Sequence, residues 1–190
     1  MSRFFWVRHG PTHARSMVGW SDLPADLSDT AQIARVAAHL PGDALIVSSD
    51  LIRASATADA IQGIRTRLPH DPGLREIHFG AWELQRFDAV DDPEHLRRFW
   101  DNPGDVRPPG GECWHEVTMR VDRAVSNLIS AHPDRDIVAV AHFGAILTQV
   151  QHALKIGAYE AFSHKIENLS VTELHRTPSG WDVVTINHHP

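Results

Sequence analysis

The segment RFFWVRHGPT, residues 3–12, decides the fold of this chain. Residues 3–7 form a short, mainly apolar run that ends abruptly in polar residues, a glycine and a proline. Runs that end in this way are typical of strands buried in a parallel sheet. We therefore predict a buried strand over residues 3–7, with Arg8 and His9 just beyond its carboxyl end.

Two further apolar runs have the same form. ALIV at residues 44–47 is followed by polar residues, and IVAVA at residues 137–141 ends at His142. Between the runs, apolar residues recur at the spacing of amphipathic helices. Strands that alternate with helices predict an α/β three-layer sandwich with a mainly parallel central sheet. The expected helices cover residues 33–40 (with Ser28 as the N-cap), 51–61, 114–128 and 146–154.

The remaining segments complete a single domain over residues 1–190. Alternating runs at residues 171–174 and 181–186 flank a Thr-Pro-Ser-Gly turn, which predicts a closing antiparallel hairpin. Residues 65–72 carry no periodic pattern, so we expect a loop there. Residues 80–111 are rich in aromatic and charged residues, but the segment is too short to form a hydrophobic core of its own. We therefore expect a helical insertion rather than a separate domain.

The overall composition excludes several classes of protein. The formal net charge is −6, whereas a surface that binds nucleic-acid phosphates is normally basic. No apolar stretch is long enough to cross a bilayer, and the start of the chain lacks the apolar region of a secretory signal. Cys113 is the only cysteine, so an intramolecular disulfide is impossible and a cysteine-based zinc site is not expected. We expect a cytoplasmic protein that binds neither membranes nor nucleic acids.

Charged and polar residues follow three of the predicted strands. Arg8 and His9 follow the first, Arg53 comes soon after the second, and His142 follows the IVAVA run. In open α/β sheets, ligands bind beyond the carboxyl ends of the strands. We therefore expect two arginines and two histidines to meet at one edge of the sheet. Because arginine forks match phosphate oxygens, the expected partner is a small phosphorylated metabolite.

A histidine held among arginines can act as a nucleophile on phosphorus. One ring nitrogen must be neutral and exposed, while the other donates to a backbone carbonyl and so fixes the tautomer. The leaving oxygen needs a proton, best supplied by a carboxylic acid with a raised pKa. Positive charge on arginines can replace the metal ion that other phosphoryl-transfer enzymes use. These residues predict metal-independent phosphoryl transfer without a cofactor.

Five blocks of sequence carry a specific resemblance. They are RHGPT (8–12), SSDLIRASATA (48–58), LREIHFGAWE (74–83), PGGE (109–112) and VAVAHFG (138–144). These blocks span almost the whole chain and resemble, in the same order, those of the histidine phosphatase superfamily, also called the phosphoglycerate mutase-like family. The resemblance implies the phosphoglycerate mutase-like α/β fold.

The resemblance implies a role for each matching residue. His9 would be the nucleophile that forms a phosphohistidine, and Glu76 would protonate the leaving group and later activate water. Arg8, Arg53 and His142 would bind the phosphoryl group and stabilise the charge of the transition state.

Three positions bear on how the phosphoryl group is bound in this chain. Phe143 would contact a phosphate oxygen through its backbone N–H, and its side chain narrows the pocket mouth where the family usually has a second glycine. Arg15 stands where relatives often have an asparagine, so its contact with phosphate is either lost or made by a longer side chain. Leu84 stands where many relatives have glycine.

Several assignments stay open between two roles. Glu83 lies one short segment beyond Glu76 and is the alternative acid, or a partner in a structural ion pair. Thr12 is either a turn-forming hydroxyl or a phosphate ligand. Arg15, Trp20 and Trp82 either line the substrate mouth or serve surface and packing roles. Most of the fourteen histidines are scattered, so we expect no catalytic metal.

Phosphatase is favoured over mutase within this family. A phosphoglycerate mutase must hold its bisphosphorylated intermediate away from water, and family members that do so are generally longer. Here only residues 80–111 and a short hairpin can cover the site. The compact length and residues 75–83 look similar to α-ribazole phosphatases. A weak phosphate-binding module is disfavoured because binding alone needs no proton donor, and the oligomeric state is open between a monomer and a homodimer.

Overall fold

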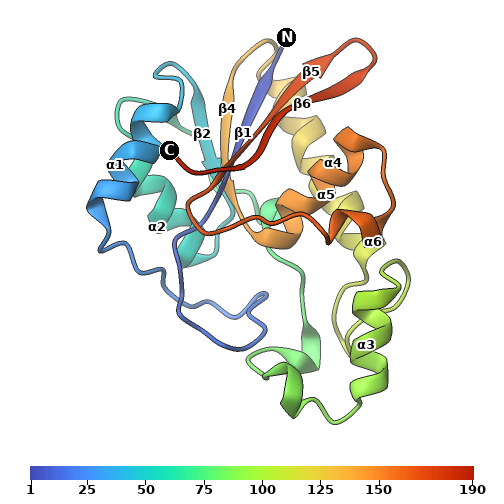
Figure 1. Ribbon diagram of the computed structural model, residues 1–190. Helices are drawn as coiled ribbons and strands as arrows, with labels where there is room; N and C mark the ends of the chain where they lie inside the picture. The colour runs from blue at the N-terminus through green and yellow to red at the C-terminus, as the bar shows by residue number, and fades with distance from the viewer.

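The computed structural model describes residues 1–190 and is built on one six-stranded sheet (Figure 1). Its strands are β1 (Arg3–Arg8), β2 (Leu45–Ser48), β3 (Thr66–Arg67), β4 (Ile137–Ala141), β5 (Val171–Thr177) and β6 (Gly180–His188). The strand order is β3-β2-β4-β1-β5-β6. The first four strands of that order run parallel, whereas β5 pairs antiparallel with both β1 and β6. The predicted mainly parallel sheet with an antiparallel hairpin at one edge is confirmed.

Helices cover both faces of the sheet and give the predicted three layers. They are α1 (Thr30–His39), α2 (Ile52–Ile61), α3 (Pro93–Asp101), α4 (Trp114–Ala131), α5 (Phe143–Leu154) and α6 (Ala158–Ala161), with 3₁₀ turns at Pro72–Leu74, Gly80–Trp82 and Phe87–Ala89. α1 and α2 lie on one face, and α4 and α5 lie on the other (Figure 1). No helix is long and apolar enough to cross a membrane.

Strand β1 is apolar throughout because both of its faces are covered. Phe4 and Trp6 belong to the core cluster that contains residues of α4 and α5, whereas Phe5 and Val7 belong to the cluster under α1 and α2. All four side chains are at most 3% exposed. Neighbouring residues of a strand face opposite sides, so burial on both sides requires an unbroken apolar run. Burying each such side chain stabilises the fold by about 1.5–3 kcal/mol.

The parallel pairing brings the carboxyl ends of three strands together. β4 lies between β1 and β2 in the sheet. Its backbone hydrogen bonds extend to the first residue after each of these two strands. The His9 N–H donates to the Ala141 carbonyl oxygen and the Ser49 N–H to the Val140 carbonyl oxygen, both at 3.1 Å. The residues that directly follow β1, β2 and β4 therefore share one edge of the sheet.

Two local predictions are wrong. Asp29, not Ser28, caps α1, because the Asp29 carboxylate accepts the Gln32 N–H at 2.9 Å. Residues 65–72, expected to be a loop, include β3, which pairs with Leu45 and Ile46 of β2. β3 has only two residues, both polar, so it has no apolar pattern by which a strand could be recognised.

Residues 80–111 contain α3 and two of the 3₁₀ turns. Leu96 and Phe99 of α3 and Trp82 are buried in the same core cluster as Trp6 of the central sheet. The segment therefore shares the main core. Its assignment as an insertion in a single domain over residues 1–190 stays a prediction.

Candidate active site

Two histidines and an arginine meet at the shared edge of the sheet. His9 directly follows β1 and His142 directly follows β4, and their ring centroids are 4.9 Å apart. Arg53 lies in the first turn of α2, and its Nε is 3.3 Å from Nε2 of His9. The structure thus brings together three of the residues that the strand-end pattern singles out.

The hydrogen bonds of His9 fix its tautomer. Nδ1 of His9 lies 2.7 Å from the Gly10 carbonyl oxygen, which can only accept. Nε2 faces the Nε–H of Arg53, which can only donate. These two contacts assign the ring hydrogen to Nδ1 and leave the lone pair on Nε2. The nitrogen that faces the arginine is therefore the nucleophilic one.

Burial keeps His9 neutral. The side chain is 6% exposed, and loss of hydration together with the positive charges of Arg53 and Arg8 lowers its pKa to about 3. The hydrogen bond to Gly10 opposes this shift but is outweighed. A neutral imidazole whose Nε2 is unprotonated is the form that attacks phosphorus.

Backbone carbonyl groups hold Arg53 in position. Its guanidinium donates to the Ser21 carbonyl oxygen at 2.9 Å and to the Gly19 carbonyl oxygen at 2.5 Å. The side chain is 1% exposed, and burial lowers its pKa from the ordinary value, but a guanidinium stays charged in proteins. Arg53 is a fixed positive charge next to His9.

Arg8 supplies the second positive charge. Its Nη1 donates to the Ile166 carbonyl oxygen at 2.6 Å, and its guanidinium carbon lies 5.7 Å from the ring centroid of Phe143. Its Nε is buried and has no hydrogen-bond partner within the protein. A buried donor of this kind is costly unless something accepts from it, and a phosphoryl oxygen is a suitable acceptor.

His142 offers a second donor of the same type. Its Nε2 lies 2.7 Å from Oγ of Ser49, which also accepts the Leu51 N–H at 3.2 Å. All three groups are satisfied when Ser49 donates its hydrogen to Nε2, which places the ring hydrogen of His142 on Nδ1. That Nδ1 is buried without a partner in the protein. Burial first, and then the positive charges of Arg53 and Arg8, lower the pKa of His142 well below its ordinary value.

Glu76 is buried beside these groups. The side chain is 7% exposed, and its Oε1 accepts the N–H of Ile77 at 3.0 Å and of Gly144 at 2.8 Å. Loss of hydration raises the pKa of Glu76, although the two N–H groups and both arginines act against this. A carboxyl group with a raised pKa is suited to deliver a proton.

The alternative acid, Glu83, lies in a different environment. Its carboxylate accepts hydrogen bonds from the backbone N–H groups of Gly19, Trp20, Ser21 and Phe79 and from the Ser21 hydroxyl. Burial alone would raise its pKa, but these bonds lower it below the ordinary value. The geometry therefore favours Glu76 as the acid.

A small cavity of about 120 Å³ lies among these residues. Its wall is completed by small side chains of the segment that follows β1. It does not include Arg15, which is exposed. The lining residues are Arg8, His9, Thr12, Ala14, Ser16, Val18, Arg53 and Glu76.

The remaining candidates divide between the mouth and the core. Thr12 lines the cavity, and Phe143 lies half-buried next to Arg8. Trp82 is buried against Phe99 with ring centroids 5.7 Å apart, so it packs in the core. The indole Nε1 of Trp20 donates to the Glu76 carbonyl oxygen at 2.8 Å.

Two supporting contacts have no signal in the sequence pattern. Nδ2 of Asn168 donates to the His9 carbonyl oxygen at 2.7 Å, across 159 positions of the chain. Oγ of Ser49 is bonded to His142; Ser49 lies in one of the five sequence blocks, but nothing in the sequence pattern pairs it with His142. Such partners are set by tertiary packing, which periodicity does not describe.

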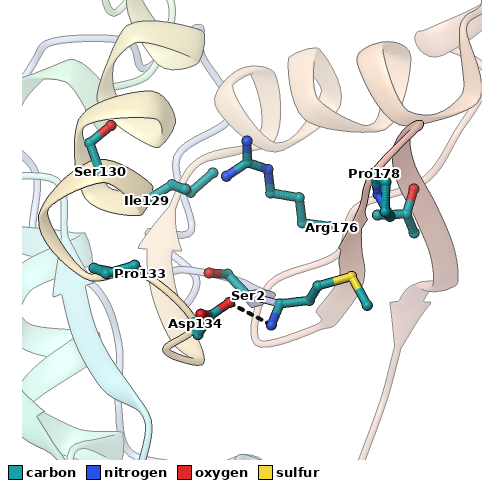
Figure 2. A pocket seen from close by; sticks show the side chains of 9 residues that line it. Ser2, Ile129, Ser130, Pro133, Asp134, Arg176 and Pro178 are labelled. Carbon is teal, nitrogen blue, oxygen red and sulfur yellow. Dashed lines mark ion pairs between the residues drawn. The ribbon is translucent and has the colours of Figure 1, made fainter.

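The structure has no group of three or more His, Cys, Asp or Glu side chains that could hold a metal ion. A larger hollow of about 450 Å³ lies at the other end of β1, between the end of α4 and the β5–β6 hairpin (Figure 2). It contains none of the predicted site residues. The exposed Met1 amino group and Asp134 form an ion pair at 2.7 Å beside it (Figure 2).

Comparisons with known proteins show similarity over almost the whole chain. A probable phosphoglycerate mutase, GpmB, of Cronobacter sakazakii is 30% identical over 189 residues, which cover 95% of this chain and 88% of the relative. Among solved structures, Bacillus stearothermophilus YhfR has a TM-score of 0.90 at 26% identity, covering 99% of this chain and 98% of that one. A mycobacterial glucosyl-3-phosphoglycerate phosphatase has a TM-score of 0.84 at 28% identity, covering 99% of both chains.

The family assignment rests on nearly the full length of the chain. The family model described as histidine phosphatase superfamily (branch 1) matches residues 4–189. This range includes all five sequence blocks and every residue of the cavity. The chain belongs to the histidine phosphatase superfamily, branch 1.

Proposed function

We propose that this protein is a metal-independent phosphatase that hydrolyses small phosphomonoesters through a phosphohistidine on His9. The observation that carries the proposal is the tautomer of His9. Its lone pair lies on Nε2, beside Arg53 and at the cavity that Arg8 and Glu76 also line. The proposed nucleophile, the positively charged arginines and the proposed proton donor therefore line one cavity of about 120 Å³.

Binding uses the donors at the cavity. Arg53 and Arg8 line the cavity and present fixed positive charge, and the unpartnered Nε of Arg8 supplies a hydrogen for a phosphoryl oxygen. His142 is not part of the cavity wall but lies against His9, and we assign its unpartnered Nδ1 as a second donor to the phosphoryl group. Charge-assisted bonds of this type are about twice as strong as neutral ones. Because these groups are already held in place by the protein, little reorganisation is needed as charge develops on the phosphoryl group.

The first chemical step transfers the phosphoryl group to the histidine. The lone pair on Nε2 of His9 forms a bond to phosphorus, and the bond from phosphorus to the ester oxygen breaks. The leaving oxygen takes the proton of Glu76, which becomes a carboxylate. The positive charge on the phosphorylated ring is stabilised by the Gly10 carbonyl oxygen, which accepts from Nδ1–H.

The second step releases phosphate. The Glu76 carboxylate takes a proton from water as the water oxygen bonds to phosphorus, and the bond to Nε2 of His9 breaks. His9 regains its lone pair and Glu76 regains its proton. The products are an alcohol and inorganic phosphate.

Access of water favours phosphatase over mutase. Ala14, one of the residues that line the cavity, is exposed, and we infer that water enters the cavity on this side. The curated relative is named a probable mutase, so phosphoryl transfer between positions of a phosphoglycerate is the second candidate. The two reactions share the first step and differ in what accepts the phosphoryl group.

The test measures release of nitrophenolate from p-nitrophenyl phosphate in EDTA. Wild type is compared with His9→Ala and with the control His152→Ala, which removes an exposed histidine of α5. We expect turnover in wild type and in His152→Ala and none in His9→Ala. Turnover that survives in His9→Ala, or that EDTA abolishes and a divalent ion restores, contradicts the mechanism.

A panel of phosphorylated metabolites then identifies the substrate class. It contains glucosyl-3-phosphoglycerate, 2- and 3-phosphoglycerate, α-ribazole 5′-phosphate and phosphoserine. Release of inorganic phosphate supports the phosphatase. Interconversion of the phosphoglycerates without phosphate release supports the mutase, and calorimetric binding of phosphate without either reaction supports a binding module.

A further inference from the structure

The turn at residues 19–21 is held by one carboxylate. Oε1 of Glu83 accepts the N–H groups of Trp20 at 2.7 Å and of Phe79 at 3.1 Å. Oε2 accepts the N–H of Gly19 at 3.0 Å, and both the N–H and the hydroxyl of Ser21, at 3.2 and 2.7 Å. Five donors therefore converge on the two oxygens of Glu83, four of them from the turn.

The same turn contacts both sides of the candidate active site. Its Gly19 and Ser21 carbonyl oxygens hold the guanidinium of Arg53. The indole Nε1 of its central residue, Trp20, donates to the Glu76 carbonyl oxygen. A displacement of the turn would therefore move the positive charge beside His9 and the backbone of the acid together.

The turn is packed closely against the segment that contains Glu83. A Cβ at Gly19 would lie 2.1 Å from the Ile77 carbonyl oxygen and 2.4 Å from Oε1 of Glu83. Only glycine fits this close approach, so the backbone of the turn is packed directly on residues 77–83. The carboxylate of Glu83 fills the inside of the turn.

We propose that Glu83 is a positioning residue that aligns Arg53 and Glu76 for phosphoryl transfer through the turn at residues 19–21. The inference rests on the proposed function, since it assigns Arg53 and Glu76 to that reaction. Glu83 itself touches neither His9 nor the cavity.

A carboxylate suits this place better than an amide. All the groups that face its two oxygens are donors, and each oxygen faces at least two of them. A glutamine would place an NH₂ group against donors in either orientation. Its neutral side chain would also lack the negative charge that acts on the guanidinium of Arg53.

The experiment compares wild type with Glu83→Gln. We expect kcat/KM for p-nitrophenyl phosphate to fall about 10- to 100-fold, since small misplacements of catalytic groups cost rates of this order. Inhibition of Glu83→Gln by inorganic phosphate should also be weaker than inhibition of wild type. The acid limb of the kcat/KM profile should move to higher pH, because Arg53 no longer suppresses protonation of His9 as strongly.

Two further variants separate positioning from loss of stability. Asp29→Ala removes the carboxylate that caps α1, which bonds only to the Gln32 N–H and does not line the cavity. It should lower the melting temperature while leaving the phosphate inhibition constant and the pH profile unchanged. Ser21→Ala removes one of the five hydrogen bonds to Glu83. It should change the phosphate inhibition constant and the pH profile in the same direction as Glu83→Gln, but by a smaller amount.

Each outcome decides one proposal. If Glu83→Gln has the wild-type phosphate inhibition and pH profile, Glu83 does not position the site and the inference is overturned. If Glu83→Gln does not fold, an unchanged Ser21→Ala overturns it. If wild type has no phosphatase or mutase turnover, the proposed function fails, and calorimetric affinity for inorganic phosphate in the same variants still tests the alignment of Arg53.

Discussion

The two ends of β1 carry hollows of opposite character. At the carboxyl end, the cavity of about 120 Å³ is lined by His9, Arg53 and Glu76, which are all at most 7% exposed. At the amino end, the hollow of about 450 Å³ is bordered by the exposed ion pair between the Met1 amino group and Asp134 (Figure 2). The smaller hollow is the one to which we assign chemistry.

The difference lies in hydration. Burying an ionisable group is costly unless other groups compensate. A cluster of several buried ionisable groups therefore lowers the free energy of unfolding. The pKa values of His9 and Glu76 are shifted in opposite directions by this burial. An exposed ion pair, by contrast, typically contributes about 0–1 kcal/mol to the free energy of unfolding. Buried ionisable groups are therefore a better guide to function here than the size of a hollow.

The largest expected effect at the carboxyl end comes from Glu76→Gln. The glutamine can still accept from Gly144 but has no proton to deliver, so kcat should fall about 10²- to 10⁴-fold. Inhibition by inorganic phosphate should stay nearly unchanged. Steady-state kinetics on p-nitrophenyl phosphate measure both. An unchanged kcat would remove Glu76 from the role of acid.

Acid pH should destabilise the fold through the buried histidines. The pKa of His9 is lowered from 6.5 to about 3, so only the unfolded chain binds a proton at this position between these values. Stability from each such histidine is complete above about pH 6.5 and falls by about 1.4 kcal/mol per pH unit below it. Urea unfolding at pH 6.5 and 5 measures this slope. His9→Asn should make it shallower, whereas the exposed His152→Asn should not; equal slopes in all three proteins would contradict a neutral, buried His9.

A smaller effect is expected from Ser49→Ala. The variant removes the hydroxyl that is bonded to Nε2 of His142, which is worth about 1 kcal/mol, or roughly a five- to ten-fold loss of kcat/KM. The matched control is Ser55→Ala on α2, whose hydroxyl donates to the Ile52 carbonyl oxygen away from the cavity. Equal losses in the two variants would mean that Ser49 does not orient His142.

The smallest effect is expected at the amino end of β1. Asp134→Asn breaks the exposed ion pair with the Met1 amino group and should leave the free energy of unfolding nearly unchanged. It should leave kcat/KM unchanged. A large loss of turnover in Asp134→Asn would break the contrast between the two ends and assign a role to the larger hollow.

Residues at strand ends could be placed from the sequence because the rule that places them is simple. Parallel strands end at a common edge, so the residues after β1 and β4 had to meet, and Arg53 in the first turn of α2 lies beside them. The apolar runs mark these strands clearly because both faces are buried. β3 lacks such a run, and its two polar residues gave no signal.

Side-chain roles outside the strand ends could not be placed in the same way. Glu83 and Glu76 are both acidic residues of one block; the resemblance favours Glu76 as the acid, but the residue pattern leaves Glu83 open until the donors around each carboxylate are known. Trp82 and Trp20 are likewise both aromatic, yet one packs in the core and the other donates to Glu76. Burial and bonding partners come from tertiary contacts, which a linear pattern does not contain.

The cavity wall after β1 has a consequence for protein engineering. Ala14, Ser16 and Val18 line the cavity with small side chains that make no hydrogen bond to the nucleophile, the acid or the arginines. A library restricted to these three positions would alter the shape of the cavity while the reacting groups keep their hydrogen-bond partners. The shape of the cavity can thus be varied without replacing a reacting group.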